Sequence, residues 1–133
     1  MDENALKRAI EELIQSGVDT FYVGNHGNFD SAVFNTLMDL KKLYPSISVS
    51  VVLAYLPSND VGDLYNGCSI YPEGLEIGPK RFAIDRRNKW MLLQAEGGYC
   101  ICFVNHDHGG AYKYAKLAKE RGVKIINLGT AKL

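Results

Sequence analysis

Two short polar loops contain the residues whose types and spacing could bind an anion. The first consists of Gly24, Asn25, His26, Gly27, Asn28, Phe29 and Asp30, and the second includes His108, Gly109 and Gly110. Glycines let a backbone approach a phosphate closely, and the free N–H groups at the start of a helix favour an anion. Neither loop matches the Gly-x-Gly-x-x-Gly dinucleotide fingerprint, so two ordinary strand-to-helix turns are the competing interpretation.

A basic segment between the two loops contains the pair Arg87-Asn88. An arginine can hold a phosphate through two parallel hydrogen bonds, and an asparagine can orient a phosphate or a ribose. Charge alone would favour a solvated helix face, since most arginines are exposed. We expect Arg87 to pair with a ligand phosphate and Asn88 to orient the ligand.

All three histidines of the chain, His26, His106 and His108, lie in the two loops. With Asp30 or Asp107 they could gather around a metal ion. Their spacing matches no standard metal motif such as His-Glu-x-x-His, and neutral histidine has many other uses. We therefore predict no metal and no cofactor, and we expect His26 and His108 to line a ligand pocket.

Two carboxylates, Glu73 and Glu76, lie in an irregular segment from residue 56 to 79. Glycosidic chemistry needs two carboxyl groups at a defined separation. With Arg87 anchoring a phosphate, these residues could form the site of an N-glycosidase. The alternative is an ordinary turn with exposed acidic residues.

Helical and strand patterns alternate along the chain. We expect helices near residues 5–16, 30–44, 80–96 and 111–121, the second capped by Asp30 or Ser31, and strands near 21–23, 49–54, 68–70, 99–104 and 123–128. This order predicts a single α/β domain over residues 1–133, Rossmann-like and doubly wound, with a mostly parallel sheet of about five strands and helices on both faces. Both polar loops then open at the carboxyl edge of the sheet, where ligands bind in such folds.

The composition excludes several classes of protein. The 133 residues contain 15 basic and 15 acidic side chains, so there is no basic surplus to meet a nucleic-acid backbone. No apolar run approaches the roughly 20 residues of a membrane helix, and the acidic start lacks a secretory signal, so we expect a cytoplasmic protein. Cys100 and Cys102 lie in an apolar run, where we expect them to pack in the core.

Taken together, these motifs resemble the SLOG superfamily, which joins the Smf/DprA proteins, the LOG phosphoribohydrolases and the YpsA-like proteins. The loop from Gly24 to Asp30 is similar to the first loop of YpsA-like proteins, in which a Phe-Asp pair follows the glycines. Arg87-Asn88 with Met91 resembles the Arg-Lys-x-x-Met of LOG proteins and the Arg-Asn-Arg of DprA. Gly109-Gly110 resembles the glycine pair of the LOG motif Pro-Gly-Gly-x-Gly-Thr-x-x-Glu.

The resemblance implies a Rossmann-like domain that binds a nucleotide or a nucleotide-derived signal, of the ADP-ribose, NAD or cyclic-nucleotide kind. Lys116 stands about where LOG proteins have their catalytic Glu. An ammonium cannot replace a carboxylate in stabilising a developing oxocarbenium charge, so we expect a sensor or sequestering module without catalysis. LOG relatives form dimers, so we also expect a homo-oligomer, in which the irregular segment of residues 56–79 could complete the site of a neighbour.

Overall fold

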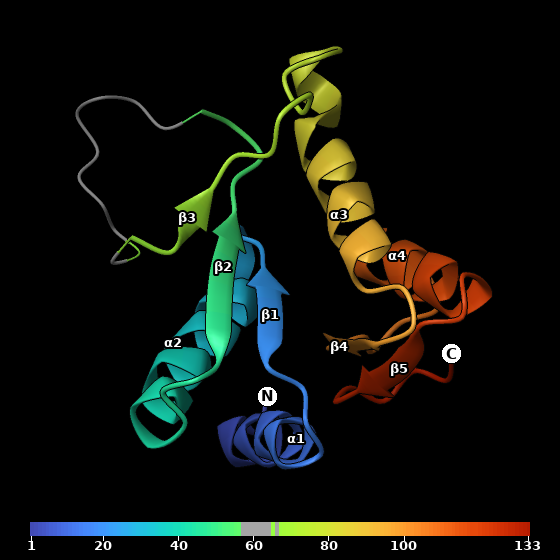
Figure 1. Cartoon of the computed structure of the whole chain (residues 1–133). Coiled ribbons are helices and arrows are strands. Elements are labelled where there is room, and N and C mark those ends of the chain that lie inside the picture. The colour runs from blue at the N-terminus through green and yellow to red at the C-terminus, as the bar shows by residue number, and fades with distance from the viewer. Residues whose placement is uncertain (57–64, 66) are drawn as a thin grey trace.

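The computed structural model describes residues 1–56, 65 and 67–133 and shows a mixed α/β chain (Figure 1). Its helices are α1 (Glu3–Gln15), α2 (Gly27–Leu43), the short 3-10 helix η1 (Lys80–Phe82), α3 (Ala83–Gln94) and α4 (Gly110–Glu120). Its strands are β1 (Thr20–Val23), β2 (Ser48–Val52), β3 (Ser69–Ile70), β4 (Tyr99–Cys102) and β5 (Lys124–Asn127). The alternation of helices and strands expected from the sequence is confirmed.

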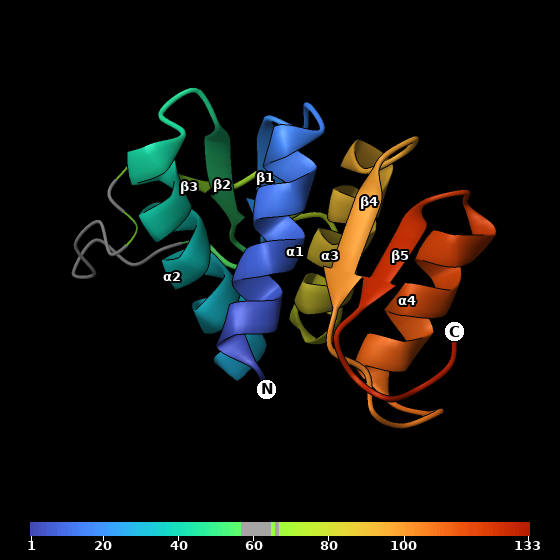
Figure 2. The same cartoon turned by 90° about the horizontal axis from the view of Figure 1, so that it is seen from below.

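The described strands form two parallel sheets instead of one. β2 lies between β1 and β3 in the first sheet, and β4 pairs with β5 in the second. Figure 2 shows the strands following one another in the order β3, β2, β1, β4, β5. The prediction of a single sheet of about five strands is therefore wrong. A sequence pattern shows which face of a strand is buried, but not which strand lies beside it. In addition, β1 and β4 are only four residues long.

Helices pack on both faces of the first sheet. Leu6 and Ile10 of α1 and Leu37 of α2 form one buried cluster with Val49 of β2, so α1 and α2 cover one face together. On the other face, the ring of Trp90 from α3 packs edge-on against Tyr22 of β1, with ring centroids 5.5 Å apart. This contact places α3 on the face opposite α1 and α2, beside the end of β1.

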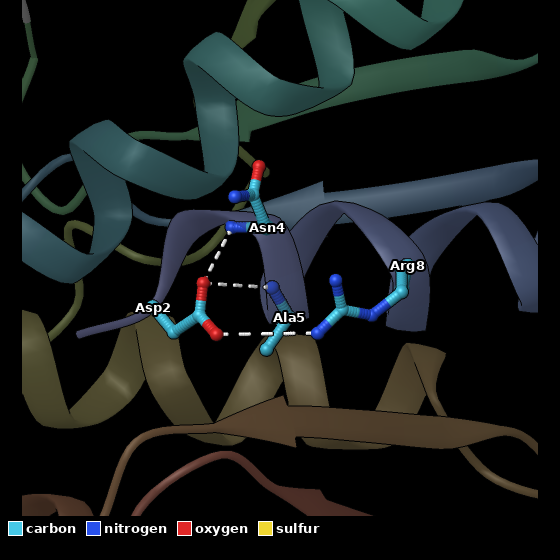
Figure 3. Close-up of polar contacts among 4 residues, drawn as sticks. All are labelled: Asp2, Asn4, Ala5 and Arg8. Carbon is cyan, nitrogen blue, oxygen red and sulfur yellow. Dashed lines mark hydrogen bonds and ion pairs between the residues drawn. The ribbon is translucent and has the colours of Figure 1, made fainter.

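The first helix has a side-chain cap at its start (Figure 3). The carboxylate of Asp2 accepts hydrogen bonds from the backbone N–H groups of Asn4, at 2.9 Å, and Ala5, at 3.2 Å. Its second oxygen lies 3.9 Å from a guanidinium nitrogen of Arg8, which is six residues further along the chain. An acidic N-cap satisfies N–H groups that lack partners within the helix, so α1 can begin directly after Asp2.

Two predicted helix boundaries are corrected by the structure. The second helix begins at Gly27, preceded by His26 as N-cap, instead of being capped by Asp30 or Ser31. Gly27 has a φ of 90°, a backbone conformation that other residues rarely adopt. The helix expected over residues 80–96 divides into η1 and α3.

The cysteines on β4 pack in the core, as expected. Cys102 is buried, and burial together with the neighbouring Cys100 raises its pKa to about 12. Burial also raises the pKa of Cys100. These thiols stay protonated at neutral pH and behave as small apolar side chains. Among the described helices, none is long and apolar enough to cross a membrane.

Candidate functional site

The centre of the candidate site is the side chain of Arg87 on α3, which is only 2% exposed. Its Nε donates a hydrogen bond to Asn88 Oδ1 at 2.7 Å. Its Nη1 donates to Asn25 Oδ1 at 3.1 Å and to the backbone carbonyl of Val52 at 3.0 Å. Its Nη2 lies 3.2 Å from His26 Nδ1. One guanidinium thus joins α3 to the end of β2 and to the turn after β1.

These four contacts change the role expected of Arg87. A guanidinium has five N–H groups, and four of them are used by acceptors within the protein. The sequence predicted that Arg87 pairs with a ligand phosphate. In this conformation, Arg87 has no free pair of N–H groups with which to do so. It keeps the turn in place and adds a buried positive charge beside it. Asn88 likewise uses its Oδ1 on Arg87.

Gly24 is the position at which the turn approaches this cation most closely. A Cβ atom at Gly24 would lie 2.6 Å from Asp30 Oδ2 and 2.8 Å from Arg87 Nη1. Real Cβ atoms essentially never approach heavy atoms this closely. The sequence singled out Gly24 as a site residue because a glycine lets the backbone approach a phosphate. In the structure, the groups that approach Gly24 belong to the protein itself.

The charge of Arg87 is accompanied by a carboxylate and a neutral imidazole. Asp30 Oδ2 accepts a hydrogen bond from the backbone N–H of His26 at 3.0 Å, which ties the first turn of α2 back to its N-cap. Burial raises the pKa of Asp30, although the His26 N–H and the Arg87 charge oppose this shift. Burial and the Arg87 charge lower the pKa of His26. His26 is therefore neutral at pH 7, with Nδ1 as the acceptor facing Arg87.

Acidification is expected to loosen this turn through His26. Burial and the Arg87 charge hold the folded-state pKa of His26 below its ordinary value of 6.5. The folded chain therefore favours the neutral imidazole, and the stability that His26 contributes is complete above pH 6.5. That contribution falls as the pH drops through 6.5 and then through the folded-state pKa. Thermal unfolding between about pH 7.5 and pH 5.5 should therefore show a larger loss of stability for the wild type than for His26→Gln, which stays neutral. Equal pH dependence of the two proteins would contradict the Arg87–His26 contact.

A pocket of about 220 Å³ opens beside the turn. It is lined by Gly24, Asn25, Asp30, Ser31, Phe34, Asn35 and Tyr65. The α2 members lie on one helix face, and the rings of Phe34 and Tyr65 meet edge-to-face at 5.3 Å. A larger cavity of about 510 Å³ lies between α4 and β5, and none of the site residues predicted from the sequence lines it.

The second polar loop lies apart from the Arg87 cluster. His108, Gly109 and Gly110 are exposed, and the ring of His108 stacks on that of His106, with centroids 5.3 Å apart. In residues 1–56, 65 and 67–133, no hydrogen bond, ion pair or ring contact joins His108 or the two glycines to Arg87. Phe29 of the first loop instead stacks on Phe103, which directly follows β4, with ring centroids 6.3 Å apart.

The two glutamates of the alternative site also stay apart from Arg87. Glu73 and Glu76 are exposed. Neither residue contacts Arg87 within the part of the chain that the structure describes. Their segment is tied to α3 by Arg86, which donates to the carbonyls of Leu75 and Pro79, both at 2.8 Å. Most of the preceding irregular segment, residues 57–64 and 66, lies outside the described residues.

The histidines do not gather around a metal position. Across the described ranges, no three His, Cys, Asp or Glu side chains lie close enough together to hold a metal ion. His26 contacts Arg87 and Tyr55, whereas His106 and His108 contact each other. In the described part of the chain, His26 therefore takes part in a hydrogen bond and a ring contact at the turn.

Sequence reasoning missed several residues that shape this edge of the molecule. Tyr55 packs edge-on against His26, with ring centroids 6.1 Å apart. Asn127, at the end of β5, accepts a hydrogen bond from the Val104 N–H at 2.9 Å and donates to the Val104 carbonyl at 3.0 Å. A polar residue closing an apolar strand was the available signal for Asn127. Tyr55 has no comparable signal, since its contact depends on tertiary packing.

The combination of a buried arginine, a glycine turn and a small polar pocket at one edge of a parallel sheet is the candidate site. Comparison of the chain with protein-family models, with curated proteins and with solved structures found no match.

Proposed function

We propose that this chain binds a nucleotide or a nucleotide-derived molecule of the ADP-ribose, NAD or cyclic-nucleotide kind, and holds it without cleaving it. The ligand lies at the carboxyl ends of β1 and β2, against the turn from Gly24 to Asp30. The chain then acts as a sensor or as a sequestering module for such a signal. Membership of the SLOG superfamily, with a Rossmann-like doubly wound fold and association into a cytoplasmic homo-oligomer, is part of this proposal.

The observation that carries the proposal is the Gly24 turn, which a fully buried Arg87 holds at the start of α2. The first N–H groups of a helix lack partners within that helix, and together with the helix dipole they favour an anion. Gly27, Asn28 and Phe29 supply these N–H groups in α2. A phosphate placed there would be held mainly by these N–H groups and the helix dipole, since Asp30 offsets the charge of Arg87, and it would leave the hydrogen bonds of Arg87 in place.

Binding without catalysis is supported by where the carboxylates lie. Glu73 and Glu76 are exposed and make no described contact with Arg87, and α4 carries Lys116 where LOG proteins have their catalytic Glu. Asp30 is the carboxylate beside the turn, and it accepts the His26 N–H. Glycosidic cleavage needs two carboxyl groups flanking one bond, and within residues 1–56, 65 and 67–133 Asp30 is the carboxylate whose charge acts on Arg87.

Calorimetric titration with AMP, ADP-ribose, NAD and cyclic ADP-ribose tests the proposal on protein shown to be folded by circular dichroism. We expect saturable binding of at least one of these ligands, and recovery of the intact ligand when the complex is denatured after long incubation. The absence of binding by all four would contradict the proposal. Release of free base would instead favour the N-glycosidase, in which case Glu73→Gln should abolish release.

A further inference from the structure

The pocket beside Asp30 has a chemistry that differs from that of the α2 N-terminus. Its lining combines the Asp30 carboxylate with the amides of Asn25 and Asn35 and an aromatic pair, Phe34 and Tyr65. A carboxylate can only accept hydrogen bonds at neutral pH and would repel a phosphate. The group that fits the pocket is therefore neutral and rich in hydrogen-bond donors.

Asp30 still has accepting capacity after its contact within the protein. An ionised carboxylate has about four lone-pair positions, and within the described part of the chain only the His26 N–H donates to it, through Oδ2. Arg87 Nη1 and Asp30 Oδ2 both lie next to Gly24, so the positive charge of Arg87 already balances the charge of Asp30. A second cation is thus not needed, whereas hydroxyl donors would complete the hydrogen bonding of the carboxylate.

The size of the pocket limits what it can hold. Its volume of about 220 Å³ is smaller than the roughly 300–1,000 Å³ of pockets that enclose a whole drug-sized ligand. It can take one part of a nucleotide but not the whole molecule. From this pocket, its lining and the charge balance at Gly24, we infer that Asp30 and Asn35 bind the ribose hydroxyls of the ligand. This inference rests on the proposed function, with the phosphate at the start of α2.

The stability of one variant distinguishes this role from a purely structural one. Because burial raises the pKa of Asp30, the ionised carboxylate is less favourable in the folded chain than in the unfolded chain at pH 7. Asp30→Asn keeps an oxygen that can accept the His26 N–H, and relief of the burial cost of the carboxylate offsets the loss of its charge beside Arg87, so its melting temperature should stay close to that of the wild type. A structural Asp30 would instead make this variant less stable.

The binding test compares AMP with dideoxyadenosine monophosphate, which lacks both ribose hydroxyls. The wild type should bind AMP about tenfold more tightly, the effect of one charge-assisted hydrogen bond. Asp30→Asn should lose most of this preference, and Asn35→Ala should lose part of it. Asp39→Asn is the matched control, since it removes the same charge from an exposed position of α2, where Asp39 pairs with Lys42.

The outcomes separate this inference from the proposed function. Equal affinity of the wild type for the two nucleotides would overturn the ribose assignment and leave phosphate binding intact. Retention of the full preference by Asp30→Asn would overturn the role of Asp30. Binding of neither nucleotide, nor of ADP-ribose or NAD, would overturn both proposals together. The comparison on the wild type needs no variant, so the inference stays testable if Asp30→Asn fails to fold.

Discussion

Replacement of Arg87 by methionine is expected to lower the free energy of unfolding by about 3–5 kcal/mol, the range seen when one partner of a buried charged network is removed. Methionine can fill most of the aliphatic volume of Arg87. It leaves the Val52 carbonyl without its donor at a buried position, and it removes the donor of Asn25 Oδ1 and His26 Nδ1 in the partly buried turn. The turn from Gly24 to Asp30 should become disordered as well.

Urea denaturation followed by circular dichroism measures this effect, with Arg81→Met as the matched control. Arg81 is exposed on η1 and its recorded contact is with the ring of Phe82, 4.8 Å from the ring centroid, so its replacement should change stability by less than about 0.5 kcal/mol. Arg87→Lys should fall between the two, because an ammonium keeps the charge but cannot reach all four acceptors. A loss below about 1 kcal/mol for Arg87→Met would mean that these hydrogen bonds are not formed in solution.

Gly24→Ala is expected to lower the free energy of unfolding by about 3 kcal/mol, the upper part of the range for overpacking a closed site. The added methyl group would lie within 3 Å of both Asp30 Oδ2 and Arg87 Nη1. Arg87 cannot move aside without breaking the hydrogen bonds that it donates to Asn25 and Val52. Nucleotide binding should be lost together with stability, because the same turn forms one wall of the pocket.

Gly110→Ala is the control for this substitution. A Cβ atom at Gly110 would meet nothing within 4 Å, and the residue lies at the start of α4. Alanine there should leave stability unchanged or raise it by up to about 1 kcal/mol, because it restricts the unfolded chain. Thermal and urea unfolding of both variants gives the comparison. If Gly24→Ala were as stable as Gly110→Ala, the close approach of Arg87 to Gly24 would be excluded.

Much of the fold could be predicted because its signals are local. The turn glycines and the apolar runs located all five described strands to within about two residues. The pairing of the strands could not be predicted in the same way. Whether β1 hydrogen-bonds to β4 depends on strand edges that meet only in the folded chain. In the structure, β1 and β4 belong to separate sheets.

The sequence predicted that some of the site residues lie together, but not how they contact one another. The sequence placed Gly24, His26, Asp30 and Arg87 in one site, and the structure brings these four together. It did not indicate that Arg87 would be buried, because a basic segment is usually solvated. It also grouped Gly110 and its neighbours with the same site, on the expectation of one continuous sheet edge.

The contacts of Arg87 have a consequence for the order in which the site can form. Arg87 is separated along the chain by 62 residues from Asn25, by 61 from His26 and by 35 from Val52. A chain synthesised from its N-terminus can form α1, β1 and α2 well before residue 87 leaves the ribosome. During that interval the glycine turn lacks the cation that holds it. The proposed ligand site is therefore completed late in synthesis, only when α3 docks onto strands that are already in place.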